Sequence, residues 1–180
     1  MTWAISTANL ERALYGDWSS ATAMTNSIKN ILTGFNLEYL MKGRFFDIGC
    51  GDGKTLHELK KSYPTTNFFG IALDSAELAK QNNPQAGIVT GSCDFILFGD
   101  GMFDVIFSSK IFDYSELGGT SPVFPKTFRT QDLAQEVKRV LRKSGIYIIF
   151  ESIEKYQADL FKLAGLTPLI DDLYLRVFQK

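Results

Sequence analysis

Short apolar runs alternate with amphipathic stretches over most of this chain. Five runs are rich in β-branched and aromatic residues, as the buried strands of a parallel sheet are: 44–48, 67–73, 87–90, 104–108 and 146–150. Between the first two runs, Leu56, Leu59 and Tyr63 recur on one side of a helical segment that Pro64 ends. This alternation predicts an α/β fold with a doubly wound, mostly parallel sheet and helices on both faces.

The last part of the chain predicts how the sheet closes. A helix is expected at about 153–164, followed by two short extended runs at 166–170 and 173–178. Two such runs separated by a polar break are typical of a hairpin at a sheet edge. We therefore expect seven strands in all, with an antiparallel last strand.

Residues 1–42 precede the first strand and contain two helix-like runs, at about 7–15 and 21–41. This segment has no place in the predicted sheet, so we expect a helical lid over the carboxyl ends of the strands. Its aromatic residues would then contact substrate or anchor the segment to the body: Trp3, Tyr15 and Trp18. Residues 43–180 would form the cofactor-binding core of the same single domain.

The first strand runs directly into a turn that contains three glycines, and Asp47 precedes them. The turn comprises Gly49, Cys50, Gly51 and Gly53 in the order G-x-G-x-G. A strand that turns through glycines into a helix leaves backbone open to a ligand. The second strand ends on Asp74, where an acid in a doubly wound sheet accepts hydrogen bonds from a ribose. Glu77 also makes Asp74 a candidate helix cap.

The spacing of the glycines distinguishes between nucleoside cofactors. A dinucleotide site has the pattern G-x-G-x-x-G and cradles a pyrophosphate. Here the pattern differs, and a carboxylate at Asp47 would repel a pyrophosphate. The same carboxylate suits a cation that carries an ammonium group and a sulfonium centre. These features favour S-adenosylmethionine as the cofactor.

The pattern D-x-G-x-G-x-G, with an acid closing the second strand, resembles motif I and its follower in class I S-adenosylmethionine-dependent methyltransferases. The likeness continues through residues 91–104, 104–108, 110–114 and 136–145, and covers about 43–152. Three positions differ from the usual family pattern: Ser92 replaces an acid, Tyr114 a histidine and Ser144 a proline.

This resemblance implies roles for individual residues. Asp47 and the glycine turn would hold the methionine part of the cofactor, and Asp74 its ribose. Three residues after the third strand would face the adenine, with simple loop geometry as the alternative: Ser92, Cys93 and Asp94. Ser108, after the fourth strand, would border the reacting methyl group.

Asp113 and Tyr114 are the candidate catalytic residues. Either side chain could orient an acceptor hydroxyl or amine, and packing or helix capping is the alternative role. Methyl transfer requires alignment of nucleophile, methyl and sulfur, and a general base only when the acceptor must lose a proton. Elsewhere, His57 is expected to be a surface or packing residue, and four basic residues to form a solvated helix face: Lys138, Arg139, Arg142 and Lys143.

Composition limits the partners. The 180 residues carry a net charge of −1, which makes nucleic-acid binding unlikely because that function needs a basic face. No apolar run is long enough for a membrane span, and a cytoplasmic location is expected. Cys50 and Cys93 are predicted to be free thiols, and no metal-ligand cluster is apparent.

These observations predict transfer of a methyl group from S-adenosylmethionine to a small-molecule acceptor, with release of S-adenosylhomocysteine. The main alternative is a catalytically inactive accessory or regulatory subunit that binds the cofactor, which would imply a partner subunit. A nicotinamide-dependent oxidoreductase is disfavoured by Asp47 and the glycine spacing. An aminopropyltransferase is disfavoured because no paired acids follow the fourth strand.

Overall fold

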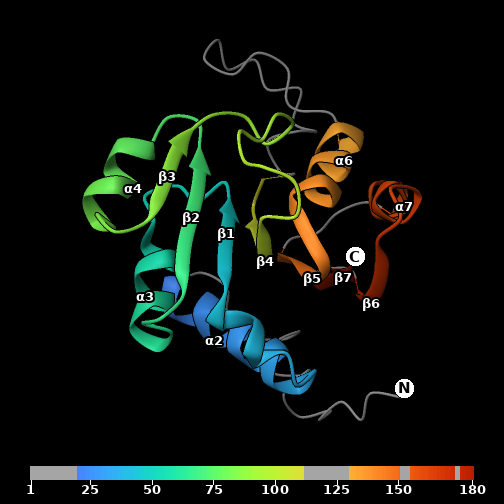
Figure 1. Cartoon of the computed structure of the whole chain (residues 1–180), viewed down its shortest axis with the longest axis horizontal. Coiled ribbons are helices and arrows are strands. Elements are labelled where there is room, and N and C mark those ends of the chain that lie inside the picture. The colour runs from blue at the N-terminus through green and yellow to red at the C-terminus, as the bar shows by residue number, and fades with distance from the viewer. Residues whose placement is uncertain (1–19, 112–129, 151–154, 173–174) are drawn as a thin grey trace.

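A computed structural model describes residues 20–111, 130–150, 155–172 and 175–180. Its centre is a seven-stranded sheet in the order β3-β2-β1-β4-β5-β7-β6 (Figure 1). The strands are β1 Arg44–Ile48, β2 Asn67–Ala72, β3 Gly87–Thr90, β4 Phe103–Ser109, β5 Leu141–Phe150, β6 Thr167–Asp171 and β7 Leu175–Gln179. The first five strands run parallel, and β7 is antiparallel to both β5 and β6. The predicted fold class is therefore confirmed.

One predicted strand is substantially longer than expected. We expected the fifth strand to begin at Ile146, because residues 136–145 resemble the helix and turn that precede this strand in the family. The structure begins β5 at Leu141, which pairs with Phe103, and a register shift separates this pair from Val105 and Ile146. An irregular, exposed stretch therefore interrupts the pairing before the buried part of the strand, and the apolar pattern detects only that buried part.

Helices cover both faces of the sheet. One face carries α2 (Ala21–Gly34), the 3-10 helix η1 (Glu38–Lys42), α3 (Lys54–Ser62) and α4 (Ala76–Asn82). The other face carries α6 (Thr130–Val140) and α7 (Lys155–Leu163), together with the loop between β3 and β4. Alternate residues of β1 show the division, because Phe45 belongs to the first apolar cluster and Phe46 to the second.

The predicted lid is wrong for residues 21–42. Helix α2 packs against α3 and η1, and it buries Ile28, Ile31 and Leu32 completely in the first apolar cluster. In Figure 1 the arrows of β1, β2 and β3 point to the top of the view, whereas α2 lies at the bottom, near the amino ends. The helical pattern shows that one side of this segment is buried, but it does not specify the buried side's neighbour. Trp3, Tyr15 and Trp18 lie outside the described residues.

In the ranges described, every helix is too short or too polar to serve as a membrane span.

Candidate functional site

The carboxyl ends of β3, β2, β1 and β4 lie next to one another because these strands are neighbours and parallel. We call this row the carboxyl edge. Three segments leave it in succession: the glycine loop (residues 49–53) after β1, the turn at Asp74 after β2, and the β3–β4 loop (residues 91–102). The order of the sheet thus brings together the segments that the sequence singled out. In open α/β sheets, ligands bind beyond this edge.

The glycine loop has a conformation that requires its glycines. Gly49, Gly51 and Gly53 all have positive φ angles, of 76°, 52° and 77°. The backbone nitrogens of Gly49 and Cys50 both donate to the carbonyl oxygen of Ile71 in β2, at 2.9 and 3.0 Å. A Cβ atom added at Gly51 would meet nothing within 4 Å. The loop is therefore fixed on its β2 side and open at Gly51, where a ligand can approach the backbone.

Asp47 is a buried acid just before this loop. Asp47 is only 3% exposed, and burial raises the pKa of its carboxyl well above the usual range. Among the residues that the structure describes, none donates a hydrogen bond to this carboxylate or forms an ion pair with it. A buried carboxylate without a partner is costly, so this position favours a ligand that brings a positive charge.

Cys50 belongs to the loop, but its thiol lies underneath it. The residue is buried in the first apolar cluster, and a Cβ atom added at Gly70 would lie 2.7 Å from its Sγ. Burial, with the nearby charge of Asp47, raises the pKa of the thiol far above its usual value. The side chain of Cys50 therefore packs between β2 and the loop.

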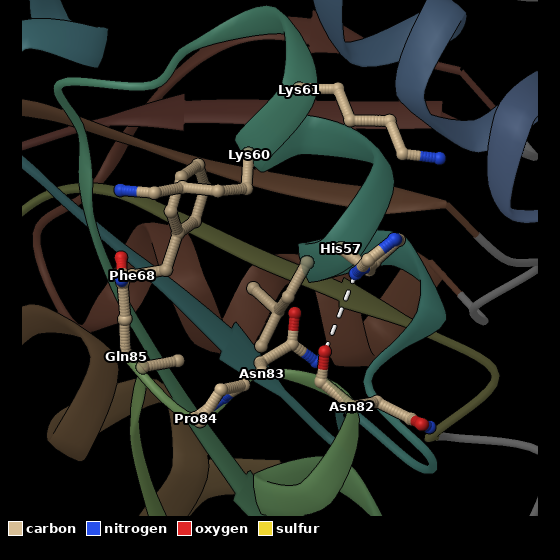
Figure 2. Close-up of a pocket in the computed structure, with 10 residues that line it drawn as sticks. His57, Lys60, Lys61, Phe68, Asn82, Asn83, Pro84 and Gln85 are labelled. Atoms are coloured by element: carbon tan, nitrogen blue, oxygen red, sulfur yellow. Dashed lines mark hydrogen bonds between the residues drawn. The ribbon is translucent and has the colours of Figure 1, made fainter.

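The end of α4 supports the glycine loop from behind, which the sequence analysis missed. The amide of Asn82 donates to the carbonyl oxygen of Asp52 at 2.8 Å, and that of Asn83 donates to the carbonyl oxygen of Gly53 at 2.9 Å. Figure 2 shows both residues opposite His57 of α3, whose Nδ1 lies 3.3 Å from the backbone oxygen of Asn82. Two adjacent amides thus fix two consecutive carbonyl groups of the loop.

These residues also line a hollow of about 390 Å³ between α3 and the turn that follows α4 (Figure 2). The hollow lies behind the glycine loop, and several of its polar groups are bonded within the chain. Lys60 donates to the carbonyl oxygens of Pro64 and Thr66, and Lys61 pairs with Glu58. We therefore assign no ligand to it.

Asp74 is exposed at the carboxyl edge and does not cap α4. The residue at the cap position is Ser75, and its side chain makes no capping bond. Glu77, which suggested a capping box, pairs instead with Lys80 at 2.6 Å. The capping alternative is therefore wrong, and the carboxylate of Asp74 is not used as a helix cap.

The β3–β4 loop begins beside β2, because the backbone nitrogen of Gly91 donates to the carbonyl oxygen of Ala72 at 3.1 Å. Ser92, Cys93 and Asp94 follow in a turn and are half-buried. Phe95 is 70% exposed, so its ring lies outside the core. This placement puts the three predicted adenine residues on the segment next to Asp74.

Two of the four basic residues predicted to form a solvated face have specific partners. Arg139 donates to both carboxylate oxygens of Glu136, at 2.7 Å each, and to the carbonyl oxygens of Ile96 and Phe98. Arg142 pairs with Asp104 at 2.5 Å. The expectation of a merely solvated face is therefore wrong for Arg139 and Arg142, because the β3–β4 loop and the start of β4 supply acceptors that the helical pattern does not reveal.

Ser108 is completely buried in β4, and its hydroxyl lies 2.7 Å from the hydroxyl of Tyr147 in β5. Ser108 pairs with Ile48, the last residue of β1, so it lies at the carboxyl edge, and its predicted contact with the cofactor stays a prediction. Asp113 and Tyr114 lie outside the described residues. Among the residues described, no three side chains of the types that usually bind metals are grouped to hold an ion.

Comparison with known proteins identifies the family. A family model described as a methyltransferase domain matches residues 46–149, more than half of the chain. No curated protein matches the sequence.

Solved structures share the fold. A TehB-like SAM-dependent methyltransferase from Corynebacterium glutamicum is 18% identical, with a TM-score of 0.64 over 97% of this chain and 95% of that chain. A possible histamine N-methyltransferase from Thermotoga maritima is 14% identical, with a TM-score of 0.57 over 88% of this chain and 96% of that one.

A third similar structure contains two proteins. It is a complex between the Haloferax volcanii Trm112 methyltransferase activator and a protein assigned as a methyltransferase, 16% identical, with a TM-score of 0.56 over 77% of this chain and 82% of that chain. The glycine loop, the carboxyl edge and the match over residues 46–149 lead to one conclusion. The chain belongs to the methyltransferase domain family and is a methyltransferase that uses S-adenosylmethionine as its cofactor.

Proposed function

We propose that this enzyme transfers the methyl group of S-adenosylmethionine to a small-molecule acceptor and releases S-adenosylhomocysteine. The observation that carries the proposal is Asp47, a buried carboxylate without a partner among the described residues, next to the open backbone of Gly51. The ammonium group of the cofactor would supply the missing positive charge. Asp74 would accept hydrogen bonds from the ribose, and residues 92–94 would face the adenine.

The contribution of these residues to methyl transfer is chiefly alignment. The sulfonium centre of the bound cofactor makes the methyl carbon electrophilic. The glycine loop and Asp47 would hold the amino-acid part, and Asp74 would fix the ribose, so that the methyl group points along the edge toward the acceptor. Asp113 and Tyr114, which follow β4, remain the candidates for orienting an acceptor hydroxyl or amine.

Two considerations favour a small acceptor. The net charge of −1 provides no broad basic face for nucleic acid. The similar Thermotoga maritima structure is described as a possible histamine N-methyltransferase, which would act on a small amine. The Haloferax volcanii complex adds a second possibility, an activating partner subunit, which would matter if the isolated chain binds the cofactor but does not turn over.

The test is calorimetric titration of the purified chain with S-adenosylhomocysteine, S-adenosylmethionine and NADH. We expect saturable binding of the first two ligands and none of NADH. Asp74→Ala should weaken both sulfur nucleosides by about 10- to 100-fold, the range expected when a charged hydrogen-bond acceptor is lost. Absence of binding by the wild-type chain would contradict the proposal.

Turnover is the second part of the test. Incubation with methyl-labelled cofactor and panels of small amines, phenols and carboxylates should label at least one acceptor. Binding without labelling, with and without added cell extract as a source of partner protein, would instead support the inactive accessory subunit.

A further inference from the structure

The β3–β4 loop contains no helix among its residues 91–102, and two side chains of α6 hold its middle. We call Glu136 and Arg139 the α6 fork. The backbone nitrogen of Ile96 donates to Oε2 of Glu136 at 2.7 Å, and Nη2 of Arg139 donates to the carbonyl oxygen of Ile96 at 2.7 Å. Both polar backbone groups of Ile96 are therefore bonded to the fork.

The fork reaches further along the same loop. Nη1 of Arg139 donates to the carbonyl oxygen of Phe98 at 2.8 Å and to Oδ1 of Asp100 at 2.9 Å. Glu136 is in turn bonded to Nε and Nη2 of Arg139, and these bonds lower the pKa of its carboxyl. Both charges of the fork are thus satisfied by each other and by loop groups, an arrangement that a planar guanidinium supports and an ammonium cannot reproduce.

The consequence is a defined orientation of the side chains near Ile96. Ile96 is buried at 2% exposure, whereas its neighbours Phe95 and Leu97 are 70% and 63% exposed. The bond from Gly91 to Ala72 ties the start of this loop to β2, whose end leads to Leu73, itself 58% exposed. Large apolar side chains are therefore kept out of the core on the two segments that border the predicted adenine position.

We propose that the α6 fork positions the adenine half of the cofactor site, by fixing Ile96 so that Phe95 presents its ring to the base while residues 92–94 face the base's polar edge. Glu136 and Arg139 are positioning residues, because they act through the backbone of Ile96 and do not touch the cofactor. This inference rests on the proposed function, since it assumes that S-adenosylmethionine binds at the carboxyl edge.

The experiment compares two ligands that share adenine and ribose. S-adenosylhomocysteine also carries the amino-acid part that would contact the glycine loop, whereas 5′-methylthioadenosine lacks it. Dissociation constants for both are measured by calorimetry on wild type, Arg139→Lys, Glu136→Gln and Asn83→Asp. Lys162→Met serves as the matched control, because Lys162 on α7 also pairs with two acids, Asp159 and Asp171, but is bonded to neither loop.

Loss of the fork should affect the two ligands equally, because both carry adenine. We expect Arg139→Lys to weaken each by tenfold or more, and Glu136→Gln to weaken each by a smaller common factor. Asn83→Asp, which disturbs the glycine loop, should weaken S-adenosylhomocysteine much more than 5′-methylthioadenosine. Lys162→Met should change neither constant. Asn83→Asp is thus the contrasting variant, because its effect depends on the amino-acid part that only S-adenosylhomocysteine carries.

Amide hydrogen exchange without ligand supplies a readout that does not depend on binding. The amide of Ile96 should exchange faster in both fork variants than in wild type. If Arg139→Lys does not fold, Glu136→Gln decides the question in both assays.

Three results would overturn the inference. If the fork variants keep wild-type affinity for 5′-methylthioadenosine, the inference is overturned and the proposed function stays intact. Faster exchange confined to α6, with the amide of Ile96 unchanged, would also overturn the inference. A wild-type chain that binds neither ligand would refute the proposed function, and the inference with it.

Discussion

Asp47 and Asp104 are both buried acids on the neighbouring strands β1 and β4, but they lie at opposite ends of that strand pair and differ in their partners. Asp104 accepts a hydrogen bond from the backbone nitrogen of Arg44 at 2.7 Å and pairs with Arg142. Asp47, at the carboxyl edge, has no partner among the described residues. Asp104 is therefore structural, and Asp47 is available to a ligand.

Asp47→Asn should separate binding from stability. The substitution removes the charge that would bind the cofactor's ammonium group, so we expect the affinity for S-adenosylhomocysteine to fall at least about tenfold. It also removes a desolvated carboxylate, so the ligand-free protein should melt at a higher temperature than wild type. Calorimetry and thermal denaturation at neutral pH measure the two effects. A lower melting temperature with unchanged affinity would show that Asp47 has a structural partner instead.

The raised pKa of Asp47 also predicts how pH acts on the ligand-free protein. The folded state holds the proton of Asp47 more tightly than the unfolded state does. The stability that protonation of Asp47 contributes is therefore fully present below the ordinary carboxyl pKa of about 3.9. That contribution is lost as pH rises through the raised value. The melting-temperature advantage of Asp47→Asn should therefore grow with pH, and a constant difference across the pH range would contradict this assignment.

Cofactor affinity should show the opposite trend with pH. Binding of the ammonium group requires the ionised form of Asp47, so the affinity of wild type for S-adenosylhomocysteine should increase as pH rises through the raised pKa. In Asp47→Asn this increase should disappear, leaving only the titration of the ligand itself. Calorimetry at a series of pH values, with the same ligand on both proteins, measures the difference.

Asp104→Ala should have the reverse profile. It removes an acceptor for the backbone nitrogen of Arg44 and the partner of Arg142, so we expect a loss of about 1–3 kcal/mol in the free energy of unfolding. Asp104→Asn retains an acceptor and should cost less. Urea denaturation measures both, and the dissociation constant of S-adenosylhomocysteine should stay within twofold of wild type. A large loss of affinity would show that the two ends of the strand pair are coupled.

Asn83→Asp tests the support behind the glycine loop. The new carboxylate would face the carbonyl oxygen of Gly53 at the position where an amide now donates at 2.9 Å, so repulsion replaces a hydrogen bond. We expect roughly tenfold weaker binding of S-adenosylhomocysteine, from the loss of one buried bond and the displacement of the loop. The catalysed reaction should show a higher KM for the cofactor with a smaller change in kcat. Unchanged KM would mean that the loop keeps its place without this amide.

Gly51→Ala tests the ligand side of the same loop. The new methyl group would have free space in the protein, and the only structural cost is the positive φ of 52°, about 1–2 kcal/mol. It would, however, project toward the position proposed for the cofactor. We expect a folded protein that binds S-adenosylhomocysteine at least tenfold more weakly. A folded variant with wild-type affinity would place the cofactor elsewhere.

Local signals explain what the sequence predicted correctly. The bounds of β1 and β3 and the conformation of the glycine loop follow from apolar runs and from glycines a few positions apart. The supports of the site depend instead on contacts distant in sequence. Asn83 is 30 positions from Gly53, and Arg139 is 43 positions from Ile96. A helical pattern showed the outer face of α6, but not that the β3–β4 loop crosses it.

The placement of α2 illustrates the same limit. Its apolar stripe predicts that one side is buried, and the structure buries that side against α3 and the sheet. Thr25 and Ser27, two small polar residues on the buried side, do not indicate which part of the protein that side packs against. The choice between the face of the sheet and its carboxyl edge depends on shape complementarity with α3, which the sequence pattern does not contain.

The supports of the two loops belong to different layers of the molecule. Asn83 extends from α4 on one face of the sheet, and Arg139 extends from α6 on the other. A cofactor that spans both loops would therefore connect the two layers mechanically. Substitutions in the two apolar clusters, additive in the free protein, should become energetically coupled when S-adenosylhomocysteine is bound, because each layer would then limit how far the other can relax.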